Sequence, residues 1–179
     1  MIDYITCLGK YYPTVFASCV GDSTVYSNLL WESGDDIPAK TVLDNKIFED
    51  LQNSAIAALS TICGNIITAG FISSALGSTY MYDSEDVDQI NLIGATTTVG
   101  PTAANPDGTS MWYAVRPVVD GITEAKTYML HTYAQLRQVM DDGANYKLGL
   151  LMNFNTKRYY IGIATTPDEV SAITWSSNP

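Results

Sequence analysis

Apolar residues recur at three- and four-residue steps over two long stretches of the chain, residues 38–69 and 132–162. This spacing places them on one face of a helix, so each stretch is predicted to form a long helix. The first stripe consists of Leu43, Ile47, Leu51, Ile56, Leu59, Ile62 and Ile66. The second consists of Leu136, Val139, Met140, Gly143, Tyr146, Lys147, Leu150, Leu151, Phe154, Arg158 and Ile161. Thr132 and Gln135 have the spacing of a capping box at the start of the second helix.

Two other stretches, residues 15–31 and about 111–130, are rich in strand-forming residues and each contains a turn signal. They predict two small antiparallel β-hairpins, and Asp120-Gly121 is a strong signal for a tight hairpin turn. Alternation along the second hairpin places one set of side chains on the same face: Trp112, Ala114 and Arg116.

Short helices are predicted where acidic capping sequences occur. One spans residues 84–93, with Gly94 at its end, and another spans 166–174, where Thr166 and Glu169 form a capping box. A further short helix is predicted to end near Gly9. Residues 95–110 contain two prolines and two glycines without periodicity, so we expect a long loop there.

Two glycines carry specific predictions. Gly70 follows the first long helix, where a left-handed residue often ends a helix. Gly64 lies inside that helix, near Ala55, Ala57 and Ala58, and we interpret it as a point of close approach between helices.

These elements predict an α+β fold in which two long helices with short capping helices are combined with two small antiparallel β-hairpins. The predicted organisation is an N-terminal β-hairpin region over residues 1–37, followed by a helical domain over residues 38–179. The second hairpin, about residues 111–130, is an insertion in that helical domain. We expect both termini to be packed within a native assembly.

The composition excludes several kinds of partner. With 9 Lys and Arg against 19 Asp and Glu, the net charge is −10, which argues against nucleic acid and anionic membranes. Charged residues make up only 16% of the chain and there are 12 tyrosines, a surface suited to contact with other proteins. Residues 1–6 lack the basic region and apolar core of a signal peptide, so synthesis in the cytoplasm is expected.

Candidate chemistry is sparse. His131 is the only histidine, which argues against a zinc site, and Cys7, Cys19 and Cys63 have no metal-ligand spacing. The acidic residues 83–88 lack the pattern of a calcium loop. We expect His131 to form a hydrogen bond at a helix N-terminus, so that His131→Ala costs about 1 kcal/mol. The sequence therefore predicts no catalytic, cofactor or metal site and a protein that is not an enzyme.

A set of residues in the middle of the chain resembles a domain of unknown function found near the C-terminal end of many bacteriophage tail and tail-fibre proteins. They are Ile66, Gly70, Phe71, Ser73, Ser74, Ala75, Leu76, Gly77, Tyr82, Asp88, Gln89, Ile90, Asn91, Leu92, Gly94 and Ala95. A second signature is similar to His131-Thr132-Tyr133-Ala134-Gln135-Leu136-Arg137-Gln138-Val139, and the ending from Ala164 to Trp175 fits the last turn of the same family. The N-terminal part is similar to small phage tail proteins.

This resemblance implies a structural virion protein of the tail, at the baseplate or the fibre attachment, acting by protein–protein contact. The implied partners are other tail proteins, and a homo-oligomer or several copies in the virion is expected. A tail-fibre assembly chaperone that is absent from the finished particle is the first alternative. A tail-borne glycan-degrading enzyme is the second.

Overall fold

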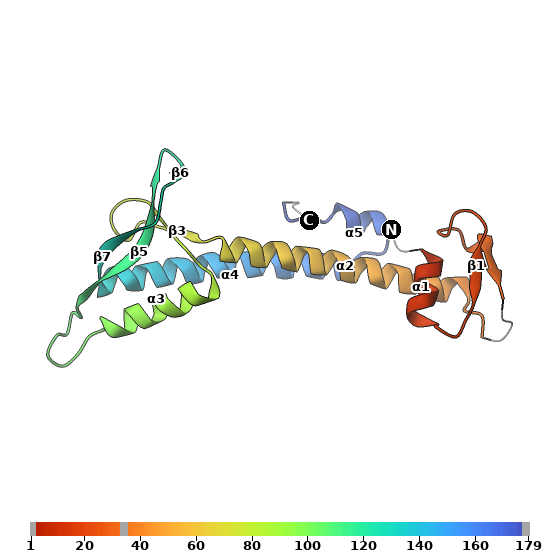
Figure 1. Ribbon diagram of the computed structural model, residues 1–179, viewed down its shortest axis with the longest axis horizontal. Coiled ribbons are helices and arrows are strands. Elements are labelled where there is room, and N and C mark those ends of the chain that lie inside the picture. The colour runs from red at the N-terminus through yellow and green to blue at the C-terminus, as the bar shows by residue number, and fades with distance from the viewer. Residues whose placement is uncertain (1–2, 33–35, 177–179) are drawn as a thin grey trace. The chain divides into compact units, whose positions relative to one another are not determined.

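The computed structural model describes residues 3–32 and 36–176, so the predicted packing of the two termini lies outside the described residues. The chain divides into two compact units: unit 1 comprises residues 1–60 and 156–179, and unit 2 comprises residues 61–155. In chain order the elements are α1 (Tyr4–Tyr11), β1 (Ala17–Cys19), η1 (Tyr26–Asn28), β2 (Leu29–Trp31), α2 (Lys40–Thr68), β3 (Phe71–Ser73), β4 (Tyr80–Tyr82), α3 (Asp86–Thr98), β5 (Ser110–Val119), β6 (Ile122–Thr123), β7 (Thr127–Thr132), α4 (Tyr133–Ile163) and α5 (Pro167–Ala172) (Figure 1).

The predicted α+β class is confirmed, and α2 and α4 are the two long helices that the apolar periodicity predicted. Each unit contains a hydrogen bond between α2 and α4. In unit 1, Gln52 Nε2 donates to the carbonyl oxygen of Ile161 (2.7 Å). In unit 2, Cys63 Sγ donates to the carbonyl oxygen of Leu150 (3.7 Å).

Unit 1 is built around the N-terminal helix and hairpin. The predicted hairpin is confirmed, although its strands are short: Ala17 pairs with Trp31 and Cys19 with Leu29. Its core consists of buried residues from α1, β2 and α2: Tyr4, Cys7, Leu8, Leu29 and Leu43. The domain boundary predicted at residue 37 falls inside this unit.

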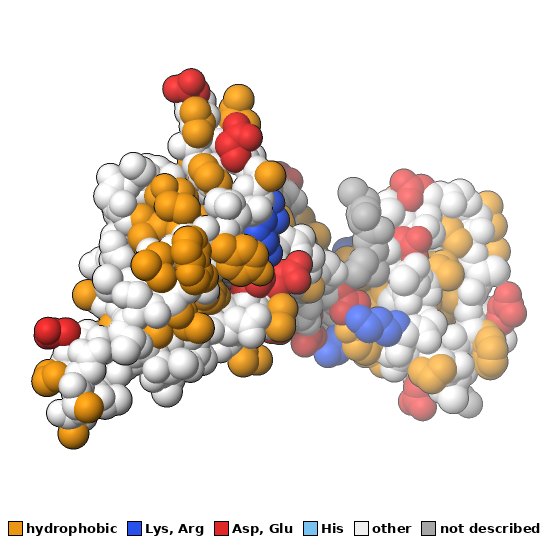
Figure 2. All heavy atoms as spheres, turned by 60° about the vertical axis from the view of Figure 1, so that its left-hand side comes forward, with side chains coloured by type: hydrophobic (Ala, Val, Ile, Leu, Met, Phe, Trp, Pro, Cys, Tyr) orange, Lys and Arg blue, Asp and Glu red, His pale blue; other side chains and the backbone are white. Residues whose placement is uncertain are grey.

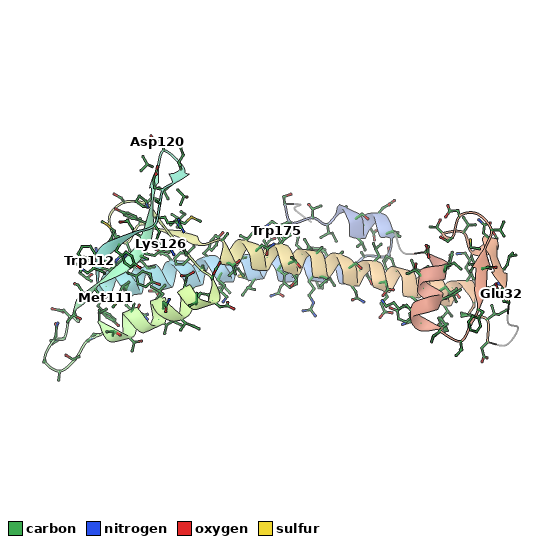
Figure 3. All side chains as sticks on the ribbon, in the orientation of Figure 1. Glu32, Met111, Trp112, Asp120, Lys126 and Trp175 are labelled. Carbon is green, nitrogen blue, oxygen red and sulfur yellow. The ribbon has the colours of Figure 1, made fainter. Side chains whose placement is uncertain are left out.

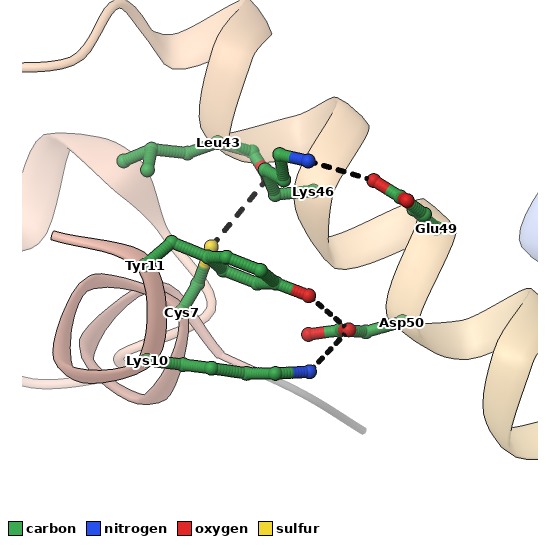
Figure 4. A network of polar contacts seen from close by, with 7 residues as sticks. All are labelled: Cys7, Lys10, Tyr11, Leu43, Lys46, Glu49 and Asp50. Atoms are coloured by element: carbon green, nitrogen blue, oxygen red, sulfur yellow. Dashed lines mark hydrogen bonds and ion pairs between the residues drawn. The ribbon is translucent and has the colours of Figure 1, made fainter.

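A polar network attaches α1 to α2 (Figure 4). The Oδ1 atom of Asp50, a buried residue of α2, accepts hydrogen bonds from Lys10 Nζ (2.5 Å) and from the Tyr11 hydroxyl. The hydrogen bond from Lys10 is the main cause that holds the pKa of the Asp50 carboxyl below its usual value, and the one from Tyr11 adds to the shift. Burial acts in the opposite direction. Asp50 therefore stays ionised. The pairing with α1 compensates at Oδ1 for its removal from water, whereas Oδ2 is buried without a hydrogen-bond partner among the described residues.

Unit 2 contains an antiparallel sheet in the order β3-β4-β5-β6, with β7 also paired to β5. Helices α3 and α4 contribute residues to a core under one face of this sheet. The buried members are Phe71, Tyr82, Leu92, Ala95, Val99, Val115, Leu136 and Val139. The hairpin predicted around Asp120-Gly121 is confirmed, and both residues have positive φ, as a tight two-residue hairpin turn requires.

The prediction of two small hairpins alone is wrong, because β3 and β4 add a third hairpin that extends the second one into a larger sheet. The predicted end of the short helix at Gly94 is also wrong. Helix α3 continues to Thr98, so the loop that follows is shorter than residues 95–110. Burial of Ala95, Thr96 and Val99 stabilises this extra turn and outweighs the weak helix propensity of Gly94.

Close approach of a glycine occurs at Gly143 rather than at Gly64. A Cβ added to Gly64 would have no atom within 4 Å, so the interpretation of Gly64 as a packing point is wrong. A Cβ on Gly143 in α4 would lie 2.7 Å from the ring of Phe71 in β3. Gly143 thus lets the sheet pack directly on the helix backbone.

Among the helices of the described residues, none is both long and apolar enough to cross a membrane.

Gly70 has a φ of 107°, and its Cβ would lie 2.7 Å from the backbone oxygen of Tyr82. We expect Gly70→Ala to lower the free energy of unfolding by about 1–3 kcal/mol, measured by chemical denaturation. Gly94→Ala is the matched control, because Gly94 is helical and no atom lies within 4 Å of the added Cβ. This control is expected to gain up to about 1 kcal/mol. Equal effects of the two substitutions would contradict the explanation.

Candidate interaction surface

The sheet of unit 2 has an apolar face that no part of the described chain covers. Side chains alternate along β5, so that Met111, Tyr113 and Val115 point to the core while the residues between them point outward. Trp112 pairs with Leu130 and Ala114 with Tyr128 across the β5–β7 ladder. On the other side of β5, Met81 pairs with Arg116 and with Ile72. We call Ile72, Met81, Trp112, Ala114, Tyr128 and Leu130 the outer face.

The largest side chains of the outer face are more than half exposed: 64% for Trp112 and Tyr128, 52% for Leu130 and 51% for Ile72. Figure 2 shows hydrophobic side chains gathered on this side of unit 2, and Figure 3 places Trp112 next to Met111 on β5. The predicted shared face of Trp112, Ala114 and Arg116 is confirmed. Exposed apolar side chains gathered on one face of a sheet are typical of a protein–protein contact site.

Ion pairs flank the outer face. Asp83 binds Arg116 Nε through Oδ1 (2.9 Å) and Lys126 Nζ through Oδ2. The hydrogen bond from Arg116 is the main cause that lowers the pKa of the Asp83 carboxyl, and Lys126 adds to the shift against the effect of burial. The three charges therefore stay ionised at neutral pH and are satisfied by one another, which leaves the neighbouring apolar side chains available for contact.

The inner face of the same sheet carries a buried polar pair. His131 is fully buried in β7, where its Nδ1 donates to the carbonyl oxygen of Met129 (2.9 Å). Because a carbonyl can only accept, Nε2 is the unprotonated nitrogen and accepts from the Tyr82 hydroxyl (2.9 Å). Burial lowers the pKa of His131, only partly offset by the bond to Met129. Burial also raises the pKa of Tyr82, and raises that of Tyr113 to about 12.

The prediction that His131 belongs to a helix cap is wrong, because the cap of α4 is made by Thr132 and Gln135 as the capping-box spacing predicted. His131 instead pairs with Tyr82 across the sheet interior. The cost of about 1 kcal/mol expected for His131→Ala is therefore too small. Truncation leaves the buried Tyr82 hydroxyl without an acceptor, which alone costs about 1–3 kcal/mol, and also creates a cavity.

The buried polar residues Ser73 and His131 of unit 2 do not form a Ser–His–Asp triad. Both ring nitrogens of His131 are occupied by Tyr82 and Met129. Ser73 donates to Asp142 (2.6 Å) rather than to a histidine. Ser73 and His131 are therefore not joined as the nucleophile and base of a Ser–His–Asp triad are.

The acidic residues at the start of α3 have structural roles. Asp83 holds Arg116 and Lys126, while Glu85 and Asp88 form a reciprocal capping box at the helix N-terminus. Within residues 3–32 and 36–176, no group of three or more His, Cys, Asp and Glu side chains is arranged to hold a metal ion.

No family model matches the chain, and no curated protein and no solved structure matches it. The resemblance to phage tail proteins accordingly stays a prediction.

The lowered pKa of His131 predicts acid sensitivity. An unfolded chain takes up the proton near pH 6.5, whereas the folded protein stays neutral to lower pH. The stability that this group contributes is therefore complete above about pH 6.5 and is lost as the pH falls toward the folded pKa, by at most about 1.4 kcal/mol per pH unit. We expect urea unfolding to show this loss between about pH 7 and pH 5.

His131→Gln is the control, because glutamine offers a neutral donor and a neutral acceptor but cannot titrate. Its stability should vary less over the same pH range. All carboxylates are common to both proteins, and the chain has one histidine, so the difference between the curves reports on His131. Parallel curves would contradict the assignment.

Proposed function

We propose that this protein is a structural component of a bacteriophage tail, at the baseplate or the fibre attachment, where it acts as an adaptor by protein–protein contact. Its partners are other tail proteins, and it is present as a homo-oligomer or in several copies. The virion tail is the place of action, after synthesis in the host cytoplasm.

The observation that carries this proposal is the outer face of unit 2. Trp112 on β5 pairs with Leu130 on β7, Tyr128 lies two residues before Leu130 on the same face, and Ile72 lies on β3; all four are more than half exposed. Large aromatic residues with aliphatic neighbours are the residues that dominate binding energy at protein interfaces. An adaptor needs such a surface, and the buried polar groups beneath it are satisfied internally rather than directed at a substrate.

A second exposed apolar group lies in unit 1, on the N-terminal hairpin. Phe16, Val20 and Leu30 are each more than half exposed. Separate apolar surfaces on the two units suit a protein that joins different neighbours. Residues 99–109, which follow α3, and this hairpin are the additional contact segments in the proposal.

The resemblance of two segments, around Gly70–Ala95 and His131–Val139, to phage tail proteins supports the same assignment. An assembly chaperone would use the outer face to hold a fibre and then leave it. A glycan-degrading enzyme would need an accessible pair of acids or a nucleophile, and the outer face offers neither.

Quantitative mass spectrometry of washed particles tests the structural role. We expect this chain at a level comparable with known tail proteins. A trace level in particles, combined with recovery on the fibre from lysate, would replace the structural role with the chaperone role. Release of sugar from host polysaccharide by the purified protein would replace it with the enzyme.

Substitution of Trp112 tests the outer face. Trp112→Thr keeps a strand-forming residue and removes the exposed indole, so the free energy of unfolding should change by less than about 0.5 kcal/mol. Loss of an aromatic hot spot costs about 2 kcal/mol or more in binding, so incorporation into particles should fall at least about tenfold. Ile90→Gln on α3, where Ile90 is 67% exposed, is the matched control and should be incorporated normally. Equal incorporation of both variants would exclude the outer face as the contact.

A further inference from the structure

Unit 1 contains an open groove of about 470 Å³ along α2, which we call the α2 groove. One wall is formed by α2 itself, and the others come from the start of α1, the turn after β1 and the start of α5. Its lining residues are Tyr4, Thr24, Asp44, Asn45, Ile47, Phe48, Leu51, Thr165 and Pro167. A volume of this size is typical of sites that take a small molecule or a few residues of a peptide.

The groove is apolar along its length and has one charged group. Ile47, Phe48 and Leu51 lie on successive turns of α2, and Pro167 contributes a further apolar surface. Asp44 is the one ionisable carboxyl among the lining residues, which include no Lys, Arg or His. An apolar ligand would remove water from this carboxylate without adding a hydrogen bond to it, and an anionic ligand would be repelled by it.

Asp44 stays ionised and keeps accepting capacity. Its Oδ1 accepts from the Tyr4 hydroxyl and its Oδ2 from Lys40 Nζ (2.6 Å). Burial raises the pKa of the carboxyl, but the hydrogen bonds from Lys40 and Tyr4 more than offset this effect and hold the pKa below its usual value. Lys40 itself is more than half exposed and pairs with Asp44 one helical turn away, an interaction that contributes little and is readily shared.

The polar lining favours a ligand with many donors. Asn45, Thr24 and Thr165 supply an amide oxygen and two hydroxyl oxygens in addition to the carboxylate. An arginine side chain carries five N–H donors in a planar fork and is more weakly hydrated than lysine. Its three methylene groups would lie on Phe48 and Leu51 while the guanidinium binds Asp44, as amphipathic side chains do at mixed surfaces.

We propose that the α2 groove binds an arginine side chain presented by a partner protein. The groove belongs to unit 1 and the outer face to unit 2, so this site is independent of the proposed function. Normal incorporation of the Trp112→Thr variant would contradict the outer face as a contact but would not bear on the α2 groove. Absence of arginine binding would contradict the groove proposal but would not bear on the outer face.

The test uses the full chain and Nα-acetyl-arginine methylamide as the probe, titrated while backbone amide resonances are followed by NMR. The matched control is the citrulline analogue, which has the same shape without the charge. We expect the arginine probe to shift the resonances of residues 44–51 and 165–167. It should bind about tenfold more tightly than the citrulline probe, because a charge-assisted hydrogen bond is roughly twice as strong as a neutral one.

Variants locate the binding. Asp44→Asn keeps an acceptor for Tyr4 but removes the charge, and it should reduce the affinity for arginine to that for citrulline. Asp168→Asn changes the net charge equally at an exposed position of α5 outside the lining and should bind as the unmodified protein does. Lys40→Ala removes the competing cation and should tighten binding, which tests the site even where Asp44→Asn fails to fold.

Three results would overturn the proposal. The first is equal binding of the arginine and citrulline probes. The second is resonance shifts that lie elsewhere than in the groove or are absent throughout the titration. The third is unchanged or weaker binding by the Lys40→Ala variant.

Discussion

The register between β5 and β7 is the constraint on which both faces of unit 2 depend. Val118 pairs with Thr123, but Val115, three residues earlier, pairs with Thr127, four residues later. The returning strand therefore contains one extra residue between β6 and β7, the signature of a β-bulge. Because side chains alternate, a shift of one residue exchanges the two faces. This extra residue puts His131 and Met129 inside and Tyr128 and Leu130 outside.

The elements that depend on local periodicity could be predicted from the sequence. Helices α2 and α4 have apolar stripes over many turns. The hairpin turn could be predicted because Asp120 and Gly121 are residue types that readily adopt the positive φ such a turn requires. Strands β3 and β4 were missed because each has only three residues. They pair with each other, and β4 gains further stability from its non-local pairing with β5. Alternation cannot be recognised over so few residues. The end of α3 was misplaced for a related reason, because contacts of Ala95 and Val99 with the core override Gly94.

The outer face was only partly predictable for the same physical reason. Alternation along β5 groups Trp112 with Ala114, but it does not indicate which face is covered. That depends on α3 and α4, which pack on the side of Tyr113 and Val115. Ile72 joins the outer face through the hairpin that the sequence did not reveal. His131 was assigned to a cap because it precedes Thr132, whereas the bulge turns its ring into the interior, next to Tyr82.

The polar groups on the buried face of the unit 2 sheet are therefore hydrogen-bonded, whereas large apolar side chains on its other face are exposed to solvent. In the interior, the Tyr82 hydroxyl donates to His131 Nε2 and His131 Nδ1 donates to the carbonyl oxygen of Met129, so these groups are hydrogen-bonded without a ligand. Outside, complete burial of a large apolar side chain is worth roughly 1.5–3 kcal/mol, and Trp112, Tyr128, Leu130 and Ile72 each have about half of their surface still to bury. Burying the exposed part of all four side chains would contribute several kcal/mol of free energy, which is not gained in the isolated chain. Folding alone does not account for this arrangement, since a polar residue at each position would preserve the sheet and improve solubility. The proposed role as an adaptor would bury this surface against a neighbouring tail protein.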